Sequence, residues 1–273
     1  MLKGKTWIGW MVLVCVLALG WGISLASVYN SPHDMAERSS SGTKSRFYFD
    51  TAQVCVFCHT PHSANETVTS TIFFNTTTSA YEDPGGGTEA FLLWNRALSN
   101  ATDFDLYSSA TMNATTSRVG VYSLLCLSCH DGLMALNVLS NPPEDREFPL
   151  EPDGGLAPGL FSAGTKLADV FYEGSSLGWG PNITERDEAT DPLNLSNDHP
   201  ISIEYPTADP GFDTLANAQA KGIRFFPGPN SNNYIECSSC HDPHNWGSNA
   251  DGTSPFLRVS VKDSELCLAC HLK

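Results

Sequence analysis

The chain alternates regularly between hydrophobic and polar positions only over short stretches, which longer polar segments separate. Residues 199–205 and 256–262 alternate in this way and predict two short strands. Residues 214–221 predict a small helix that Gly222 ends. Residues 88–98 predict another helix, because their apolar side chains recur on one helical face. The pattern contains no long periodic helix and no continuous series of strands, so we expect loops to dominate the fold.

The first 26 residues form a separate apolar segment. Lys3 and Lys5 precede the uncharged run Trp7–Ala26, which ends in the small-residue sequence Ser24–Ala26. This order of basic, apolar and small residues predicts a cleaved signal peptide over residues 1–26. The alternative is an uncleaved membrane anchor, because about 20 apolar residues can cross a bilayer. Both interpretations place the rest of the chain outside the cytoplasm, at the cell surface or in the extracellular space.

Composition and charge narrow the possible functions. Hydrophobic residues make up 41% of the chain and charged residues 16%, and much of the rest is Ser, Thr, Asn, Gly and Pro. Such a composition does not build a thick aliphatic core, so we expect a group other than side chains to fill part of the interior. The formal net charge of −15 argues against nucleic-acid binding, which requires a basic surface.

Cysteine spacing supplies the most specific signal in the chain. An exported protein with eight cysteines would ordinarily contain disulfides, but here every cysteine beyond residue 26 belongs to one of four C-x-x-C-H motifs. This motif is the attachment signature of c-type haem and predicts four covalently bound haem c groups. The predicted attachment residues are Cys55, Cys58, Cys126, Cys129, Cys237, Cys240, Cys267 and Cys270. The predicted proximal iron ligands are His59, His130, His241 and His271.

The spacing of the motif suits this chemistry. Two thiols one helical turn apart can each form a thioether bond with one vinyl group of the same porphyrin. The adjacent histidine is then held at the iron as its proximal ligand. Structural zinc sites also use C-x-x-C pairs, but zinc does not explain a histidine after every pair. A thioredoxin-like redox site would need a single such motif on a βαβ unit.

The remaining histidines match the predicted irons in number. The four that lie outside the C-x-x-C-H motifs are His33, His62, His199 and His244. We predict that they are distal ligands; the alternative is that they are ordinary surface histidines. Two histidines per iron leave no position for a substrate, which favours electron transfer over enzymatic catalysis. Met35, Met112 and Met134 are alternative ligands, but we expect them to be packing residues.

The motifs form two pairs that repeat one another. Cys55–His62 and Cys237–His244 both read C-x-x-C-H-x-P-H, and Leu125–His130 and Leu266–His271 both read L-C-L-x-C-H. We interpret this arrangement as a duplicated two-haem module.

The repeat also gives the expected domain organisation. Residues 27–273 are predicted to form one tetrahaem domain whose modules cover about residues 27–140 and 237–273, while residues 141–236 carry no C-x-x-C-H motif. The expected fold class is a multihaem cytochrome c, consisting mostly of loops with short helices and few short strands wrapped around a stack of four haems.

The spacing within the opening motifs predicts which haem each distal histidine serves. His62 and His244 each follow the proximal histidine of their motif by three residues, so both side chains leave the same side of the local turn. A histidine there cannot easily reach the far face of its own haem. We therefore predict that His62 ligates the haem of Cys126 and that His244 ligates the haem of Cys267. The other two haems would take the two remaining histidines.

Several short sequences beyond the motifs carry a resemblance to a known family. They are Cys58-His-Thr-Pro-His62, Cys240-His-Asp-Pro-His244, Asn197-Asp-His-Pro200 and Ser31-Pro-His33-Asp34. With the four motifs, they make the chain resemble the OmcE-like tetrahaem c-type cytochromes, which polymerise into extracellular filaments called cytochrome nanowires. The resemblance implies a homopolymer with a continuous haem stack, in which one haem takes its distal histidine from the adjacent subunit. By position, His33 is the candidate for that ligand.

Three functions of different classes are consistent with these features. The preferred one is a conducting filament that carries electrons from the cell surface to an external acceptor. The second is a monomeric periplasmic or surface electron shuttle, which the haem count equally permits. The third is a membrane-anchored quinol-oxidising tetrahaem subunit, which an uncleaved N-terminal helix would suit. A nitrite or hydroxylamine reductase would need a vacant haem position, which eight ligand histidines do not leave.

Overall fold

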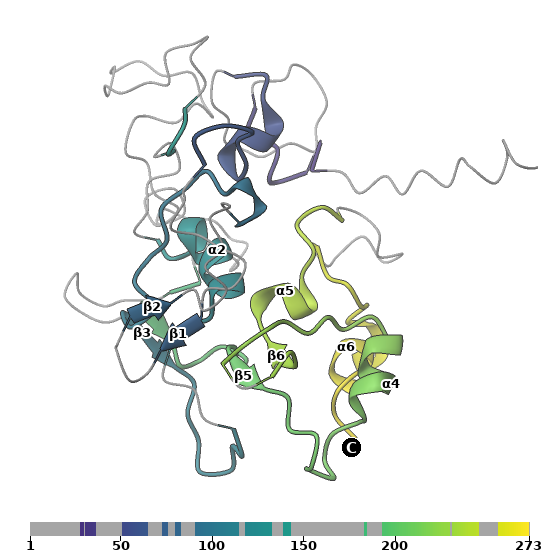
Figure 1. Cartoon of the computed structure of the whole chain (residues 1–273). Helices are drawn as coiled ribbons and strands as arrows, with labels where there is room; N and C mark the ends of the chain where they lie inside the picture. The colour runs from purple at the N-terminus through teal and green to yellow at the C-terminus, as the bar shows by residue number, and fades with distance from the viewer. Residues whose placement is uncertain are drawn as a thin grey trace, which may run out of the picture.

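The described part of the protein consists of short helices and two-stranded sheets joined by long connections (Figure 1). It is a computed structural model that describes residues 28–29, 31–36, 51–64, 73–75, 80–82, 91–114, 118–132, 139–142, 183–184, 193–229, 231–245 and 256–272. The predicted signal peptide, Met134 and residues 143–182 lie outside these ranges. Within them, no helix has the length and apolar character needed to cross a membrane.

Each C-x-x-C-H motif begins within a short helix or at its start. The helices at the motifs are η1 (Val54–Phe57), α2 (Val121–His130), α5 (Cys237–Cys240) and α6 (Glu265–Leu268). The other described helices are η2 (Phe91–Leu93), α4 (Leu215–Ala220) and η3 (Lys262–Ser264). In α2, Leu124 and Leu127 are fully buried. Tertiary burial of this kind stabilises a helix that is too short to be stable alone.

Helix α4 confirms the helix predicted over residues 214–221. At its N-terminus, the Thr214 hydroxyl accepts a hydrogen bond from the Asn217 N–H at 3.2 Å, which satisfies one of the free donors of the first turn. Gly222 follows the C-cap residue of the helix, Lys221, and has a φ of +106°. This conformation favours glycine and ends the helix.

Three two-stranded sheets connect segments of the chain. Strands β1 (Phe73–Asn75) and β2 (Ala80–Glu82) are antiparallel, as are β5 (Ile203–Glu204) and β6 (Tyr234–Ile235), with Ile203 opposite Ile235. Strands β3 (Phe104–Leu106) and β4 (Leu193–Leu195) are parallel, with Phe104 opposite Leu193. The parallel pair joins two segments that lie far apart in the sequence.

Two predicted elements are wrong and one is shortened. The strand predicted over 199–205 is reduced to β5, because Ser202 has a φ of 57° directly before it. In place of a strand over 256–262, Leu257 forms only a single bridge to His241. The helix predicted over 88–98 is also wrong in its described part, residues 91–98, where only the short turn η2 forms and Leu92 and Leu93 have positive φ. Left-handed backbone at non-glycine residues interrupts both helices and strands.

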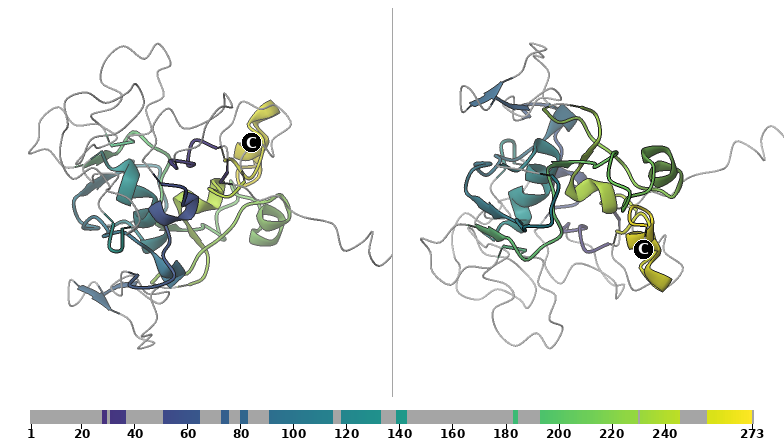
Figure 2. Two further views of the ribbon diagram at one scale, coloured as in Figure 1. Left: turned by 90° about the horizontal axis from the view of Figure 1, so that it is seen from above. Right: turned by 90° about the horizontal axis from the view of Figure 1, so that it is seen from below.

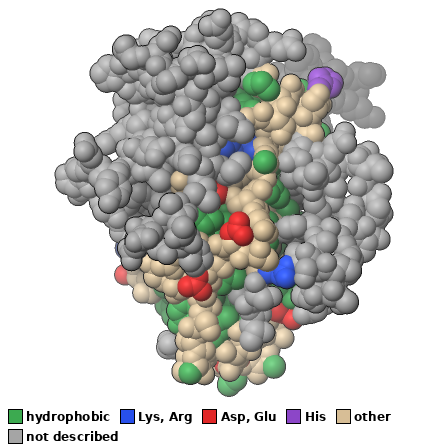
Figure 3. All heavy atoms as spheres, turned by 90° about the vertical axis from the view of Figure 1, so that its left-hand side faces the viewer, with side chains coloured by type: hydrophobic (Ala, Val, Ile, Leu, Met, Phe, Trp, Pro, Cys, Tyr) green, Lys and Arg blue, Asp and Glu red, His purple; other side chains and the backbone are tan. Residues whose placement is uncertain are grey.

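Buried side chains form several small clusters beside the motif helices. One cluster surrounds α2 and the β3–β4 pair, and another surrounds β5, β6 and α4, where the partly buried Met112 also packs. Helix α5 lies between α2 on one side and α4 and α6 on the other (Figures 1 and 2). On the face drawn in Figure 3, the described surface is mostly uncharged, with isolated acidic and basic side chains and an exposed histidine near its upper edge.

Candidate functional site

Each C-x-x-C-H motif forms one turn of helix. In three motifs the histidine N–H donates to the carbonyl of the first cysteine: His59 to Cys55 at 2.8 Å, His241 to Cys237 at 3.1 Å and His271 to Cys267 at 2.9 Å. The remaining proximal histidine, His130, is the last residue of α2. A helical turn sets both cysteines of a pair on one side of the chain, as double attachment to one porphyrin requires.

Backbone bridges hold three of the motifs against distant segments. In each bridge the carbonyl of the second cysteine accepts an N–H from the partner segment, and the residue after the histidine donates an N–H back. In the first motif, Asn95 donates to Cys58 at 2.8 Å and Thr60 donates to Leu93 at 2.9 Å. The bridges pair His59 with Trp94, His241 with Leu257 and His271 with Phe212. Each of these histidines is therefore fixed by residues outside its own motif.

The bridges of the first and third motifs share an uncommon backbone conformation. Leu93 and Phe256 directly precede the bridging residues and have φ angles of 51° and 59°. Positive φ is uncommon for residues with large side chains. Its recurrence at equivalent positions means that the segments that bridge to the two C-x-x-C-H-x-P-H motifs share one backbone conformation. In the bridge of the fourth motif, Gly211 occupies the same position.

A buried arginine anchors the second motif. Arg96 is fully buried, and its Nε and Nη2 donate to the Ser128 carbonyl at 3.2 and 3.0 Å. Ser128 lies between the two cysteines of the second motif. Burial raises the pKa of Cys58 to about 12, against the opposing effect of the Arg96 charge. The guanidinium therefore lies between the first and second motifs.

Cysteines of different motifs lie in contact. The side chains of Cys126 and Cys237 interact, which raises the pKa of Cys126 and lowers the pKa of Cys237. The Cys237 N–H donates to the Ser123 hydroxyl at 3.0 Å, which ties α5 to α2. The second and third motifs are therefore adjacent, although more than 100 residues separate them in the sequence.

Three proximal histidines each face one predicted distal histidine. The ring centroids of His59 and His244 are 6.1 Å apart, and the two ring planes are nearly parallel, with an angle of 22° between them. The centroids of His33 and His130 are 6.0 Å apart. Those of His199 and His271 are 6.4 Å apart. These pairs assign a different partner to each of the three distal histidines.

Hydrogen bonds to backbone carbonyls orient several of these imidazoles. His59 Nδ1 lies 2.5 Å from the Leu92 carbonyl, and His199 Nδ1 lies 3.0 Å from the Pro200 carbonyl. A bond of this kind fixes the proton on Nδ1 and leaves Nε2 free to bind a metal. Burial, followed by the nearby His130, lowers the pKa of His33 to about 4. His33 is therefore neutral at pH 7, the form that binds metals.

The structure differs from the predicted ligand pairing. His244 faces His59 of the first motif rather than the fourth motif, and His33 rather than His62 faces His130. The spacing within the motif predicts that the His244 side chain serves a neighbouring motif, but spacing alone does not indicate which one. That neighbour is set by segments that pack together across the two modules. His33 also faces His130 of its own chain, whereas the family resemblance implies a ligand for an adjacent subunit.

The paired imidazoles fit two axial ligands of one iron. Imidazoles that bind one metal from opposite sides, each at about 2 Å, have ring centroids roughly 6 Å apart. The three observed separations, from 6.0 to 6.4 Å, agree with this geometry. Among the described residues, no group of three or more His, Cys, Asp or Glu side chains converges on one point. An axial pair is not such a group, because a porphyrin supplies the other four iron ligands.

Exposed leucines beside the first and fourth motifs also fit a porphyrin. Leu92 and Leu93 adjoin the first motif and are 49% and 47% exposed, and Leu268 and Leu272 adjoin the fourth and are 41% and 52% exposed. Large exposed apolar side chains that gather in one place usually have a partner. A porphyrin face tethered at either motif is an apolar plate of the kind that would cover them.

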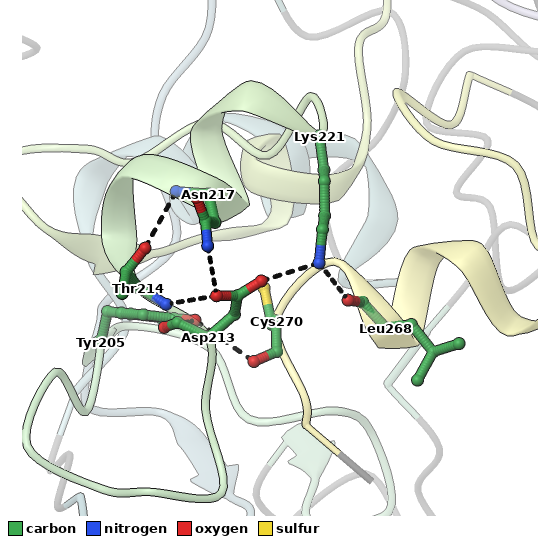
Figure 4. Close-up of polar contacts among 7 residues, drawn as sticks. All are labelled: Tyr205, Asp213, Thr214, Asn217, Lys221, Leu268 and Cys270. Atoms are coloured by element: carbon green, nitrogen blue, oxygen red, sulfur yellow. Dashed lines mark hydrogen bonds and ion pairs between the residues drawn. The ribbon is translucent and has the colours of Figure 1, made fainter.

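A polar network ties the fourth motif to residues 205–221 (Figure 4). Lys221 Nζ donates to Asp213 Oδ2 at 2.7 Å and to the Leu268 carbonyl at 2.9 Å. The Tyr205 hydroxyl donates to the Asp213 carbonyl at 2.9 Å and to the Cys270 carbonyl at 3.3 Å. The hydrogen bond from Lys221 is the largest cause that lowers the pKa of Asp213 to about 2. These contacts fix the turn that carries the fourth cysteine pair.

A buried carboxyl group that the sequence did not predict lies between α2 and α5. Glu236 is 2% exposed and accepts hydrogen bonds from the hydroxyls of Ser123 at 2.5 Å and Ser202 at 2.9 Å. Burial raises its pKa to about 7, against the effect of both hydroxyls. A Cβ atom at Gly120 would overlap the carboxyl group, so glycine is required there. The residue types carry no signal for this site, which forms only when the segments converge.

His62 is the last of the predicted distal ligands, and Met35 and Met134 are the remaining alternative ligands. His62 is exposed, and its carbonyl accepts hydrogen bonds from the Thr60 hydroxyl and the Asn141 amide. Met35 is half-buried, and Met134 lies outside the described residues. A scan against protein-family models and a search of the curated proteins find no match for the chain.

Proposed function

We propose that this protein is an exported tetrahaem c-type cytochrome that transfers electrons and is not an enzyme. The observation that carries the proposal is the set of three imidazole pairs, each with centroids 6.0 to 6.4 Å apart and each built on a C-x-x-C-H turn. In this proposal the axial ligands are His59 with His244, His130 with His33, and His271 with His199. The cysteine pair of each motif would hold the porphyrin through two thioether bonds.

The fourth iron would take the two histidines that remain, His241 and His62. The first and third motifs have the same C-x-x-C-H-x-P-H sequence and the same bridge conformation. Since His244 of the third motif faces the proximal histidine of the first, a reciprocal exchange would direct His62 of the first motif to the third. Such an exchange holds two porphyrins close together, which favours electron transfer between them.

The chemistry of bound haem is one-electron exchange between ferric and ferrous iron. Two histidines of this chain would hold each iron, so that substrates would have no access to it. Backbone carbonyls such as that of Leu92 fix the imidazole protons and so set the basicity of the ligands. The contact between Cys126 and Cys237 brings two attachment sites together, which supports electron transfer between the second and third haems.

The expected location is the cell surface or the extracellular space. Polymerisation into a conducting filament stays a prediction from the family resemblance. The contact between His33 and His130 within one chain favours a subunit that is complete in its own ligands. A filament of such subunits would use other surface contacts at its junctions. A monomeric shuttle and a membrane-anchored quinol-oxidising subunit are the alternative forms of the same electron-transfer function.

Mass spectrometry and low-temperature spectroscopy of the purified holoprotein test the proposal. Intact mass should show four covalently attached haems, and peptide mapping should assign one to each cysteine pair. Electron paramagnetic resonance should show only low-spin ferric iron. Fewer than four haems, or a high-spin iron in the wild-type protein, would contradict four bis-histidine sites.

A further inference from the structure

Trp94 lies directly beside the proximal histidine of the first motif. Its backbone bridges to His59, and its indole meets the His59 imidazole edge to face, with centroids 5.6 Å apart at 86°. The indole also packs against apolar side chains, because Val121 and Leu125 of α2 form a buried cluster with Trp94. The indole therefore lies between the first motif and the helix that carries the second.

The indole nitrogen of Trp94 is buried without a hydrogen-bond acceptor. Trp94 is 8% exposed, and its Nε1 has no partner among the residues that the structure describes. Buried tryptophan N–H groups usually find an acceptor, because an unsatisfied buried donor has lost its hydrogen bond to water without replacing it. Val121 and Leu125 offer no acceptor atom in their side chains. An acceptor from outside the polypeptide would replace that hydrogen bond.

The surroundings favour an anionic acceptor. The buried guanidinium of Arg96 belongs to the same segment, two residues along the chain. A buried cation in the same segment favours a carboxylate acceptor over a neutral carbonyl. Haem c carries two propionate carboxylates, and a porphyrin attached at Cys55 and Cys58 would lie within reach of a side chain that contacts His59.

We propose that the Trp94 indole N–H donates a hydrogen bond to a propionate of the haem attached at the first motif. This inference rests on the proposed function, because it requires a haem at Cys55 and Cys58. Trp94 is then a positioning residue: its hydrogen bond offsets the negative charge of the propionate. Less negative charge near the iron favours the ferrous form, so the bond raises the reduction potential of this one haem.

The test removes the N–H and keeps the shape of the side chain. Trp94 is replaced in the full-length holoprotein by 3-benzothienylalanine, which carries sulfur in place of the indole N–H. Trp94→Phe is the second variant, and the same analogue at Trp179, in the motif-free stretch, is the control. Peptide mass mapping first establishes whether haem is attached at Cys55 and Cys58. Potentiometric titration and ultraviolet resonance Raman difference spectra of the indole then follow.

The expected result is a shift of one of the four haem potentials to more negative values in both Trp94 variants, with no shift in the control. The wild-type minus variant Raman spectrum should show a strongly hydrogen-bonded indole N–H. If haem is attached at the first motif while the potentials are unchanged and the N–H is free, the inference is wrong and the proposed function stands. A first motif without attached haem would overturn both.

Discussion

The imidazoles of His59 and His244 face one another with ring centroids 6.1 Å apart, although they belong to the first and third C-x-x-C-H motifs. The α5 turn ends at His241, where the backbone is extended, and His244, three residues later, lies beside the first motif. The same spacing relates His62 to His59. If His62 in turn ligates the third haem, as we propose, the two opening motifs exchange distal ligands and neither module is complete without the other.

Replacement of His244 tests this exchange. We expect His244→Ala to convert the haem at Cys55 and Cys58 to a high-spin state and to leave the haem at Cys267 and Cys270 low-spin, because His199 faces His271. Magnetic circular dichroism counts the high-spin irons. A hyperfine-resolved NMR spectrum of the ferric protein identifies the affected haem.

His62→Ala is the matched variant for the reciprocal half of the exchange. It should affect the haem of the third motif and leave the haem of the second motif unchanged, because His33 faces His130. If the haem of the fourth motif instead lost its low-spin signal in His244→Ala, the result would support the pairing within modules that the sequence predicts.

Glu236 predicts a pH-dependent stability. Its pKa rises on folding from 4.5 to about 7, so the native state binds more protons than the unfolded state between these values. The contribution of this group to the free energy of unfolding is therefore fully present below pH 4.5 and is lost as the pH rises through 7, a difference of about 3 kcal/mol. Denaturant unfolding of the holoprotein at a series of pH values between 4.5 and 8 measures this dependence.

Glu236→Gln provides the control for this prediction. The amide oxygen can still accept the hydrogen bonds of Ser123 and Ser202, but the side chain no longer titrates. The fall in stability between pH 4.5 and 7 should be absent from the variant. An equal fall in the wild type and the variant would show that other groups cause it.

Lys221 predicts an effect at acid pH. Its hydrogen bond lowers the pKa of Asp213 from 3.8 to about 2. The stabilisation from this carboxylate is present above pH 3.8 and is lost as the pH falls through 2. Lys221→Met should therefore move acid unfolding to a higher pH, which circular dichroism in a pH titration detects. Lys262→Met, at an exposed position on η3, is the control and should leave the acid transition unchanged.

The sequence predicted the local features of this protein better than its long-range contacts. The four C-x-x-C-H turns and helix α4 follow from a few neighbouring residues, such as Thr214 at the start of the helix and Gly222 after its end. The predicted helix over 88–98 failed because Trp94 forms a bridge to His59 instead, a contact across more than 30 residues.

The same distinction applies to the candidate site. All eight histidines could be assigned a role from their number and spacing, but the partners of His33, His199 and His244 depend on how distant segments pack. Glu236 could not be predicted at all, because its environment forms only where Gly120 and two serines converge. In the proposed haem protein, local spacing determines which residues are candidates for haem binding, and tertiary packing determines which of them would share an iron.

The position of His33 predicts how ligation depends on protein concentration. Because His33 faces His130 of its own chain, a dilute monomer should keep all four irons six-coordinate and low-spin. A ligand donated by an adjacent subunit would instead leave one five-coordinate iron once the assembly dissociates. Spectra recorded during dilution, with mass photometry to count subunits, separate these two cases.

Electron microscopy of the wild type beside His33→Ala extends this test to the filament. If subunits polymerise through surface contacts, the variant should still form filaments and should contain one high-spin haem per subunit. Filaments that vanish in His33→Ala, together with a five-coordinate iron in the diluted wild type, would show that His33 ligates the neighbouring subunit. In that case the coordinate bond would be part of the filament junction.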